Sequence, residues 1–350
     1  MLRFSASVIV LALLLCVASA QNTTNPPDQP VLDVSSMDKT VDPCVDFYTY
    51  SCGGWMKKNP VPPDQSSWSA YSKLQDETLL RLRGILEAAT AGGSERTPVQ
   101  QKIGDYYASC MDEKTVEAAG AAPLKPGLQE INNLSSKDEL ANMAVRMADE
   151  GVLFNFGSQQ DYRDANQVIA GLDQGGLGLP DRDFYLKDDA KSLELRKAYL
   201  AHVQKVFELL GDKPEVAARE SDTVMRIETA LAKGSLTQVE RRNPKNLDHK
   251  MSNQQLASLS PAFHWNEYFT KAGVPPVQSL NVATPEFFKT LDAQLKNEDL
   301  ASWKTYLRWH LAHSDAPYLS SNFVNANFDF YGKTLRGAEE LRPRWKRCVG

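Results

Sequence analysis

Apolar side chains recur with the period of an α-helix through most of this chain beyond residue 66. Leu79, Leu82 and Leu86 stand three or four residues apart, which places them on one helical face, and Ser66 or Ser67 is the expected N-cap. Similar spacing, or residues that start and stop helices, predicts helices over 66–89, 99–112, 137–150, 190–210, 214–233, 253–259, 284–296, 299–313 and 322–335, and a last one that begins near Gly337 and includes Trp345. Because each helix has an apolar face to cover, the sequence predicts a mainly α, multi-helical fold.

One stretch breaks the helical pattern. Residues 152–156 and 167–172 are short runs rich in apolar side chains, with polar residues between them, which predicts two strands paired as a small β-hairpin. Gly175, Gly176 and Gly178 follow and predict a loop. These glycines lack the spacing of a dinucleotide-binding loop and the lysine of a phosphate-binding loop, so a turn that needs positive φ explains them better.

The first twenty residues have the pattern of an export signal. Arg3 supplies a positive charge, residues 8–17 are apolar without interruption, and Ala-Ser-Ala at 18–20 is a cleavage sequence. We therefore predict a signal peptide over residues 1–20 and a protein exported to the periplasm or the extracellular space. An uncleaved membrane anchor is the alternative, although the apolar run is short for a bilayer.

The rest of the composition is that of an ordinary globular protein. Hydrophobic residues make up 42% of the chain and charged residues 24%, which excludes disorder as its main state. Residues 21–40 are polar and predict a flexible lead-in to the main region at 41–350. The net charge is -5 and no block of Lys and Arg is present, so nucleic acid is excluded as a partner.

Cysteine usage fits an oxidising compartment. Cys16 leaves with the signal peptide, and Cys44, Cys52, Cys110 and Cys348 remain. Their spacings do not resemble a zinc knuckle, so disulfides are the better explanation. Four cysteines allow three complete pairings, and spacing alone does not choose among them.

No complete active site is found among the residues that usually carry hydrolysis. None of the five histidines begins an H-E-x-x-H zinc motif, and no G-x-S-x-G elbow is present. His310 and His313 share a helical face and are the nearest approach to a metal-binding pair. Because no third ligand lies nearby, we expect them to be interfacial residues of an amphipathic helix, beside Trp303, Tyr306 and Trp309. The sequence therefore predicts no catalytic residue and no metal ligand in this chain.

Aromatic residues are dense between positions 47 and 71. They are Phe47, Tyr48, Tyr50, Trp55, Trp68 and Tyr71. Packing against the first long helix is the expected role, and a sugar-binding platform is the alternative. The alternative requires Trp55 and Trp68 to be exposed.

Three sequence motifs carry a resemblance to a known family. Residues 42–55 read D-P-C-V-D-F-Y-T-Y-S-C-G-G-W, residues 178–185 read G-L-P-D-R-D-F-Y, and residues 344–348 read R-W-K-R-C. These motifs, their order and their rough spacing resemble the amino-terminal region of the neprilysin and endothelin-converting-enzyme family of zinc metallopeptidases. The resemblance covers the chain from about residue 38 to its end.

The resemblance implies a role without bond cleavage. The family's chains continue for about the same length again, and that part carries H-E-x-x-H and the third zinc ligand. The region present here corresponds to a helical cap, which helps to enclose a chamber that admits small peptides and excludes folded proteins. We therefore expect the amino-terminal part of a secreted zinc metalloendopeptidase, inactive and zinc-free without its carboxyl-terminal catalytic region. A non-catalytic exported helical binding protein derived from the family is the alternative.

The resemblance also assigns roles to single residues. Cys110 and Cys348 match a family disulfide, whereas Cys44 and Cys52 match cysteines whose partners lie near the distant carboxyl terminus. In this chain those two are expected to be free, to pair with each other, or to cross-link chains. Family members that remove dipeptides carry an arginine just before the aromatic residue that is Trp68 here. Ser67 takes that place at a possible pocket edge, so we expect no strong preference for a terminal carboxylate.

Overall fold

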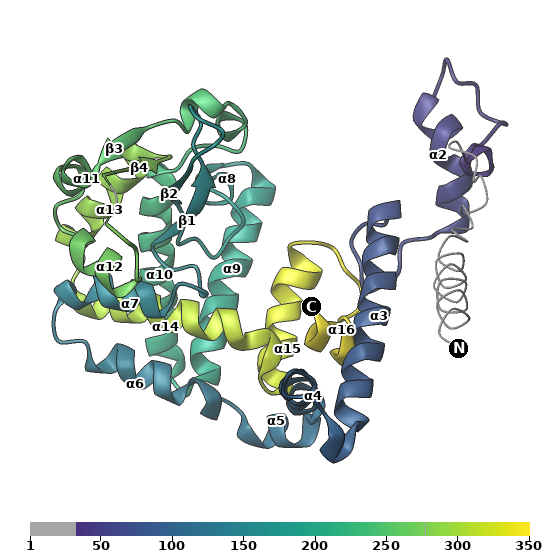
Figure 1. Cartoon of the computed structure of the whole chain (residues 1–350), viewed down its shortest axis with the longest axis horizontal. Helices are drawn as coiled ribbons and strands as arrows, with labels where there is room; N and C mark the ends of the chain where they lie inside the picture. The colour runs from purple at the N-terminus through teal and green to yellow at the C-terminus, as the bar shows by residue number, and fades with distance from the viewer. Residues whose placement is uncertain (1–32, 277) are drawn as a thin grey trace, which may run out of the picture. The chain divides into compact units, whose positions relative to one another are not determined.

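The computed structural model describes residues 33–276 and 278–350, and their coordinates form two compact units, divided between Val61 and Pro62 (Figure 1). The predicted signal peptide, Cys16 and most of the predicted lead-in lie outside the described residues. No helix among the residues described is long and apolar enough to cross a membrane.

The described part of the first unit is a short 3-10 turn, η1 (Val34–Ser36), and one helix, α2 (Phe47–Lys58). Asp46 caps α2 by accepting a hydrogen bond from the Thr49 backbone N–H at 2.9 Å. A Cβ atom at Gly54 would lie 2.7 Å from the Met37 carbonyl oxygen. The C-G-G-W sequence therefore needs glycine at position 54 because the chain around η1 passes directly over α2.

The second unit is mainly helical, as predicted. Its α-helices are α3 (Ala70–Ala91), α4 (Pro98–Met111), α5 (Glu113–Ala119), α6 (Lys125–Asn133), α7 (Leu140–Arg146), α8 (Asp183–Leu186), α9 (Ala190–Leu209), α10 (Pro214–Gly234), α11 (Asn253–Leu259), α12 (Trp265–Lys271), α13 (Pro285–Asn297), α14 (Leu300–Asp315), α15 (Ser321–Asn327) and α16 (Arg344–Val349). A π-helical turn, η8 (Phe328–Thr334), continues α15. Helices α2, α5, α6, α8 and α12 were not predicted, because they are short or show no long apolar period.

A four-stranded sheet accompanies the helices, in the order β1-β2-β4-β3. The predicted hairpin is confirmed by β1 (Phe154–Gln160) and β2 (Val168–Gln174), which pair antiparallel with Phe154 opposite Gln174. Strands β3 (Lys250–Ser252) and β4 (Ser279–Val282) were not predicted. Strands this short are too brief to show alternation, and β4 depends on its parallel pairing with β2.

The core of the second unit lies around α10 and α14. Helix α10 packs against α9, α13 and α14, and Trp303, Tyr306 and Trp309 of α14 are completely buried. The 299–313 helix is amphipathic, as expected, because Ala301 is exposed and Lys304 and Arg308 are partly exposed opposite its buried face. The expectation that His310 is interfacial was wrong, since this residue is buried in the core.

Three predicted helix boundaries were also wrong. The helix expected from residue 66 begins at Ala70, because the N-cap is Ser69, whose hydroxyl accepts from the Ser72 N–H at 3.2 Å. The helix expected over 137–150 is a 3-10 turn (Lys137–Glu139) followed by α7, and it ends early as the chain turns into the core towards β1. The helix expected near Gly337 begins at Arg344, after Pro343 as its N-cap residue, and Gly337 itself has a non-helical φ of 79°.

Much of the aromatic segment is exposed rather than packed. Tyr71 in the second unit is 86% exposed, so the expected core packing was wrong for this residue. Phe47 and Tyr48 belong to the first unit and are 68% and 67% exposed. The sugar-binding alternative requires Trp55 and Trp68 to be exposed. Both are half-buried, so their burial neither supports nor excludes that alternative. Tyr71 lies in the first turn of α3, and its exposure leaves an aromatic ring on the surface of the second unit.

Candidate functional site

The glycine-rich loop after β2 is held by a buried carboxylate. Gly176 has a φ of 72°, which confirms the predicted positive φ at this one glycine. Gly175 and Gly178 do not have a positive φ, so that reason was wrong for them. At Gly178 a Cβ atom would lie 1.9 Å from the Tyr199 hydroxyl oxygen. The absence of a side chain lets the Gly178 backbone N–H donate to Glu228 Oε1 at 3.2 Å.

Glu228 is completely buried and its carboxylate is surrounded by donors. The hydroxyls of Tyr185 and Tyr199 both donate to Oε2 at 2.8 Å. His310 Nε2 lies 3.2 Å from Oε1. Burial and the Glu228 charge raise the pKa of both tyrosines well above its usual value, so the two hydroxyls stay protonated donors. This network fastens the 178–185 motif to α9 and α10, and the role we assign to it is structural.

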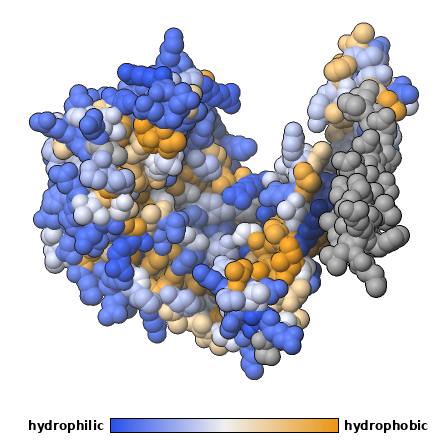
Figure 2. Space-filling view, in the orientation of Figure 1, coloured by the Kyte–Doolittle hydropathy of each residue, from blue (hydrophilic) through white to orange (hydrophobic). Residues whose placement is uncertain are grey.

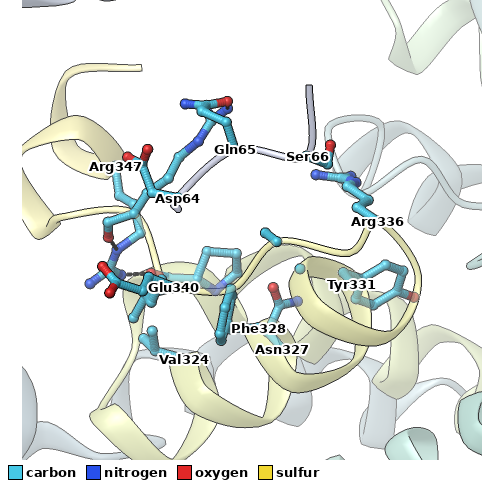
Figure 3. A pocket seen from close by; sticks show the side chains of 15 residues that line it. Asp64, Gln65, Ser66, Val324, Asn327, Phe328, Tyr331, Arg336, Glu340 and Arg347 are labelled. Atoms are coloured by element: carbon cyan, nitrogen blue, oxygen red, sulfur yellow. Dashed lines mark hydrogen bonds between the residues drawn. The ribbon is translucent and has the colours of Figure 1, made fainter. Parts of the chain in front are cut away.

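Tyr331 connects the buried network to an open pocket. Its hydroxyl donates to the Gly178 carbonyl oxygen at 2.9 Å, and its ring lines the pocket. The pocket encloses about 220 Å³ (Figure 3). Its walls come from residues 64–66, from the end of α15 with η8, from the loop at 336–342 and from Arg347 on α16. Segments far apart in the sequence thus meet at one cavity.

Two of the three arginines in this pocket are engaged by protein groups. Arg347 donates to the Pro317 and Arg342 carbonyl oxygens, and Arg342 donates to Gln65 Oε1 at 2.9 Å. Arg336 is exposed and forms no hydrogen bond or ion pair within the part of the chain that the structure describes. In Figure 3 its side chain lies beside Ser66, above the Tyr331 end of the pocket. A guanidinium without a partner makes that end suited to an anion.

The predicted pocket-edge residues lie next to this cavity. Ser66 lines it, while Ser67 and Trp68 follow directly in the chain and are not among its lining residues. Ser67 is exposed and Trp68 is half-buried. Sequence analysis did not identify Arg336 or Tyr331, because the pocket joins segments more than 250 residues apart. It also missed Glu228, although a carboxylate between Val224 and Leu231 on one apolar helical face was a usable signal.

Cys110 and Cys348 form a disulfide in the structure, with Cα atoms 5.8 Å apart. This is the pairing that the family resemblance implies. Beside it, Arg344 Nε donates to the Cys110 carbonyl oxygen at 2.6 Å, so α16 is fastened to α4 by two bonds. Cys44 is exposed and Cys52 is half-buried, and neither forms a disulfide with another cysteine of the described residues.

The histidines do not fit a zinc ion. His310 is 2% exposed and lies against Glu228, and His313 stacks on Trp309 with ring centroids 5.1 Å apart. Within residues 33–276 and 278–350, no group of three His, Cys, Asp or Glu side chains is placed to hold a metal. A zinc site needs at least three protein ligands, so no chemical step is assigned to a metal held by these residues.

The comparisons with known proteins agree with the motifs. Residues 43–350 match the amino-terminal family model of peptidase family M13. The chain belongs to peptidase family M13. Among M13 relatives, mouse endothelin-converting enzyme 1 is 30% identical over 329 residues, which cover 90% of this chain and 42% of that protein. Neprilysin-3 of Drosophila melanogaster is 30% identical over 339 residues, 90% of this chain and 43% of that protein.

A solved M13 structure shares the fold. The zinc metalloprotease Zmp1 of Mycobacterium tuberculosis, in complex with an inhibitor, superposes with a TM-score of 0.84 at 30% identity. The match covers 91% of this chain and 49% of Zmp1. The chain therefore spans about half the length of the M13 proteins that it resembles. Its mainly α fold matches the amino-terminal domain of the two-domain M13 enzymes.

His202 makes stability depend on pH. Burial lowers the pKa of His202 to about 4. Because the folded-state pKa lies below the unfolded value of about 6.5, the contribution of His202 is complete above pH 6.5 and is lost as the pH falls towards 4. Between pH 7 and pH 4.5 the free energy of unfolding should fall in both proteins. We expect it to fall by about 2–3 kcal/mol more in the native chain than in His202→Gln. Urea unfolding at both pH values measures this.

Lys205→Gln is the control, since Lys205 is exposed on the same helix. It should keep the native pH dependence. Equal losses in the native chain and in His202→Gln would contradict the prediction.

Proposed function

We propose that this chain is the amino-terminal part of an exported zinc metalloendopeptidase that hydrolyses small peptides. In this proposal it supplies the cap and part of the chamber wall, and a carboxyl-terminal region supplies zinc and the catalytic groups. The observation that carries the proposal is the M13 match over residues 43–350, which spans about half the length of relatives such as Zmp1. The absence of H-E-x-x-H from this sequence supports the assignment of zinc binding and catalysis to a carboxyl-terminal region.

An exposed apolar stripe on α3 also supports a missing partner. Tyr71, Leu74 and Ile85 are 86%, 61% and 57% exposed and fall on one side of the helix. Val99 and Tyr106 of α4 are 69% exposed. Figure 2 shows hydrophobic residues gathered on the surface over α3 and α4. Apolar surface of this kind is typical of a face that another protein segment covers.

The reading frame is the direct test. We expect the transcript from the source cells to continue in frame beyond codon 350 and to encode H-E-x-x-H. An antibody against the chain should detect a product about twice as long. A stop codon after Gly350 together with a stable short product would contradict the proposal. That result would favour the alternative, a non-catalytic exported binding protein.

The isolated chain gives a second expected result. Purified after expression in zinc-supplemented medium, it should hold no stoichiometric zinc by metal analysis and should not cleave a quenched fluorescent peptide library. The reason is that the donor groups among the described residues do not fit the ion. The full-length product, prepared in parallel, is the positive control. One tightly held zinc per 350-residue chain, with hydrolysis that a chelator stops, would contradict the assignment of catalysis to another region.

Export follows from the sequence of residues 1–20 and belongs to the same proposal. The product recovered from outside the cytoplasm should begin at Gln21. A mature protein that still begins at Met1 and sediments with membranes would support the uncleaved anchor instead.

A further inference from the structure

We propose that the pocket beside Tyr331 binds the carboxyl terminus of a short peptide, with the Arg336 guanidinium as its ionic partner. The peptide class rests on the proposed function. An anchor at Arg336 reverses the expectation, drawn from Ser67 alone, that a terminal carboxylate is not strongly preferred. Three properties of the pocket carry the inference: one uncommitted cation, a fixed apolar wall and polar groups suited to an amide.

The cation is Arg336. The other two arginines of the pocket already donate to protein acceptors, so their donors are partly used within the chain. Arg336 is exposed and forms no hydrogen bond or ion pair with any described residue. A planar guanidinium offers two parallel donors to a carboxylate, which gives a stronger and more directional contact than a single charge.

The negative charges of the pocket leave this end open to an anion. Asp64 lies 3.1 Å from Lys346 Nζ and is compensated by it. Glu340 lies across the cavity near Val324 in Figure 3, on the side away from Arg336. Since the acidic groups lie away from the Tyr331 end or are paired, the potential beside Arg336 favours a carboxylate.

The apolar wall is held in place by its backbone. A Cβ atom at Gly332 would lie 2.3 Å from the Phe328 ring, so the ring rests directly on the π-helical turn. The hydrogen bond from the Tyr331 hydroxyl to the Gly178 carbonyl oxygen fixes the second ring. Single π-helical turns inside helices are frequent at functional sites. Two fixed rings below an arginine suit an apolar side chain next to a terminal carboxylate.

The size and the polar lining favour a peptide end. About 220 Å³ is less than the roughly 300–1,000 Å³ of sites for drug-sized ligands, so the cavity suits one terminal residue. Asn327 and Ser66 line the same cavity and offer hydrogen-bonding groups for the preceding amide. A simple aromatic acid would use the cation and the wall but not these amide partners.

Binding to the 350-residue chain tests the site without catalysis. The probes are N-acetyl-Ala-Phe with a free carboxylate, its carboxamide, and 3-phenylpropionate, measured by calorimetry at pH 7. We expect the carboxylate peptide to bind about tenfold more tightly than the carboxamide and also more tightly than 3-phenylpropionate. In Arg336→Ser the preference for the carboxylate should disappear, and in Arg336→Lys it should be reduced.

Lys333→Ser is the matched control, because it removes one positive charge from an exposed residue of η8 that does not line the pocket. It should keep the tenfold preference. Equal binding of acid and amide, no binding of the acid, or an equal loss in Lys333→Ser would each overturn the proposal. Equally tight binding of 3-phenylpropionate would overturn the peptide as ligand. None of these results bears on the reading frame or on zinc, so the proposed function fails or stands separately.

Discussion

Glu228→Ala is expected to lower the free energy of unfolding of the second unit by about 3–5 kcal/mol. The carboxylate is completely buried and accepts hydrogen bonds from Gly178, Tyr185 and Tyr199. Removing it leaves three buried donors without an acceptor, together with a cavity where the side chain was. Urea unfolding followed by tryptophan fluorescence measures the loss, because Trp303 and Trp309 lie in the same core.

Two further variants separate the carboxylate's role from a general effect of substitution. Glu228→Gln keeps one acceptor oxygen and nearly the same shape, so we expect a smaller loss of about 1–3 kcal/mol. Glu194→Ala removes an exposed glutamate from α9 and should change stability by less than about 0.5 kcal/mol. A loss below 1 kcal/mol in Glu228→Ala would show that the buried network does not stabilise the fold.

Replacing Cys110 and Cys348 with alanine together is expected to cost up to about 5 kcal/mol under oxidising conditions. The disulfide joins residues 238 positions apart, so it removes much of the conformational freedom of the unfolded chain. Thermal and urea unfolding of the double variant and the native chain measure the difference.

Reduction provides the control for this prediction. In the presence of a phosphine reductant the native chain and the double variant should unfold at nearly the same urea concentration, since neither then has the cross-link. Cys44→Ser should unfold like the native chain under both conditions, because Cys44 is exposed and forms no disulfide with another cysteine of the described residues. A double variant as stable as the oxidised native chain would contradict the prediction.

Long helices and the hairpin were the elements that sequence patterns predicted best. The 190–210 and 214–233 helices were confirmed as α9 and α10 almost residue for residue, because each combines a strong end signal with an apolar stripe. Boundaries failed where the pattern alone offered several starts, as at Ser66, Ser67 and Ser69. The choice of Ser69 depends on how the preceding segment meets the rest of the unit, which local sequence does not encode.

The candidate site was less accessible to sequence reasoning than the fold. Ser67 and Trp68 were chosen through the family resemblance, and they lie one and two residues after a residue of the pocket. Arg336 has no distinguishing pattern around it in the sequence. Arg336 has no hydrogen-bond or ion-pair partner among the described residues, whereas Arg342 and Arg347 have partners there. Only side-chain positions reveal that difference.

The sequence by itself determined the helical class, the hairpin and membership of the metallopeptidase family, because apolar periods and the three motifs are local properties of the chain. It also showed that an H-E-x-x-H motif is absent. Only the tertiary structure decided that the aromatic side chains of α14 lie in the centre of the core, that Glu228 joins the 178–185 motif to the core, and that residues 64–66 and 336–347 contribute to one pocket. Burial and long-range contacts depend on which surfaces meet, and the energy of those contacts is fixed only when distant segments pack together.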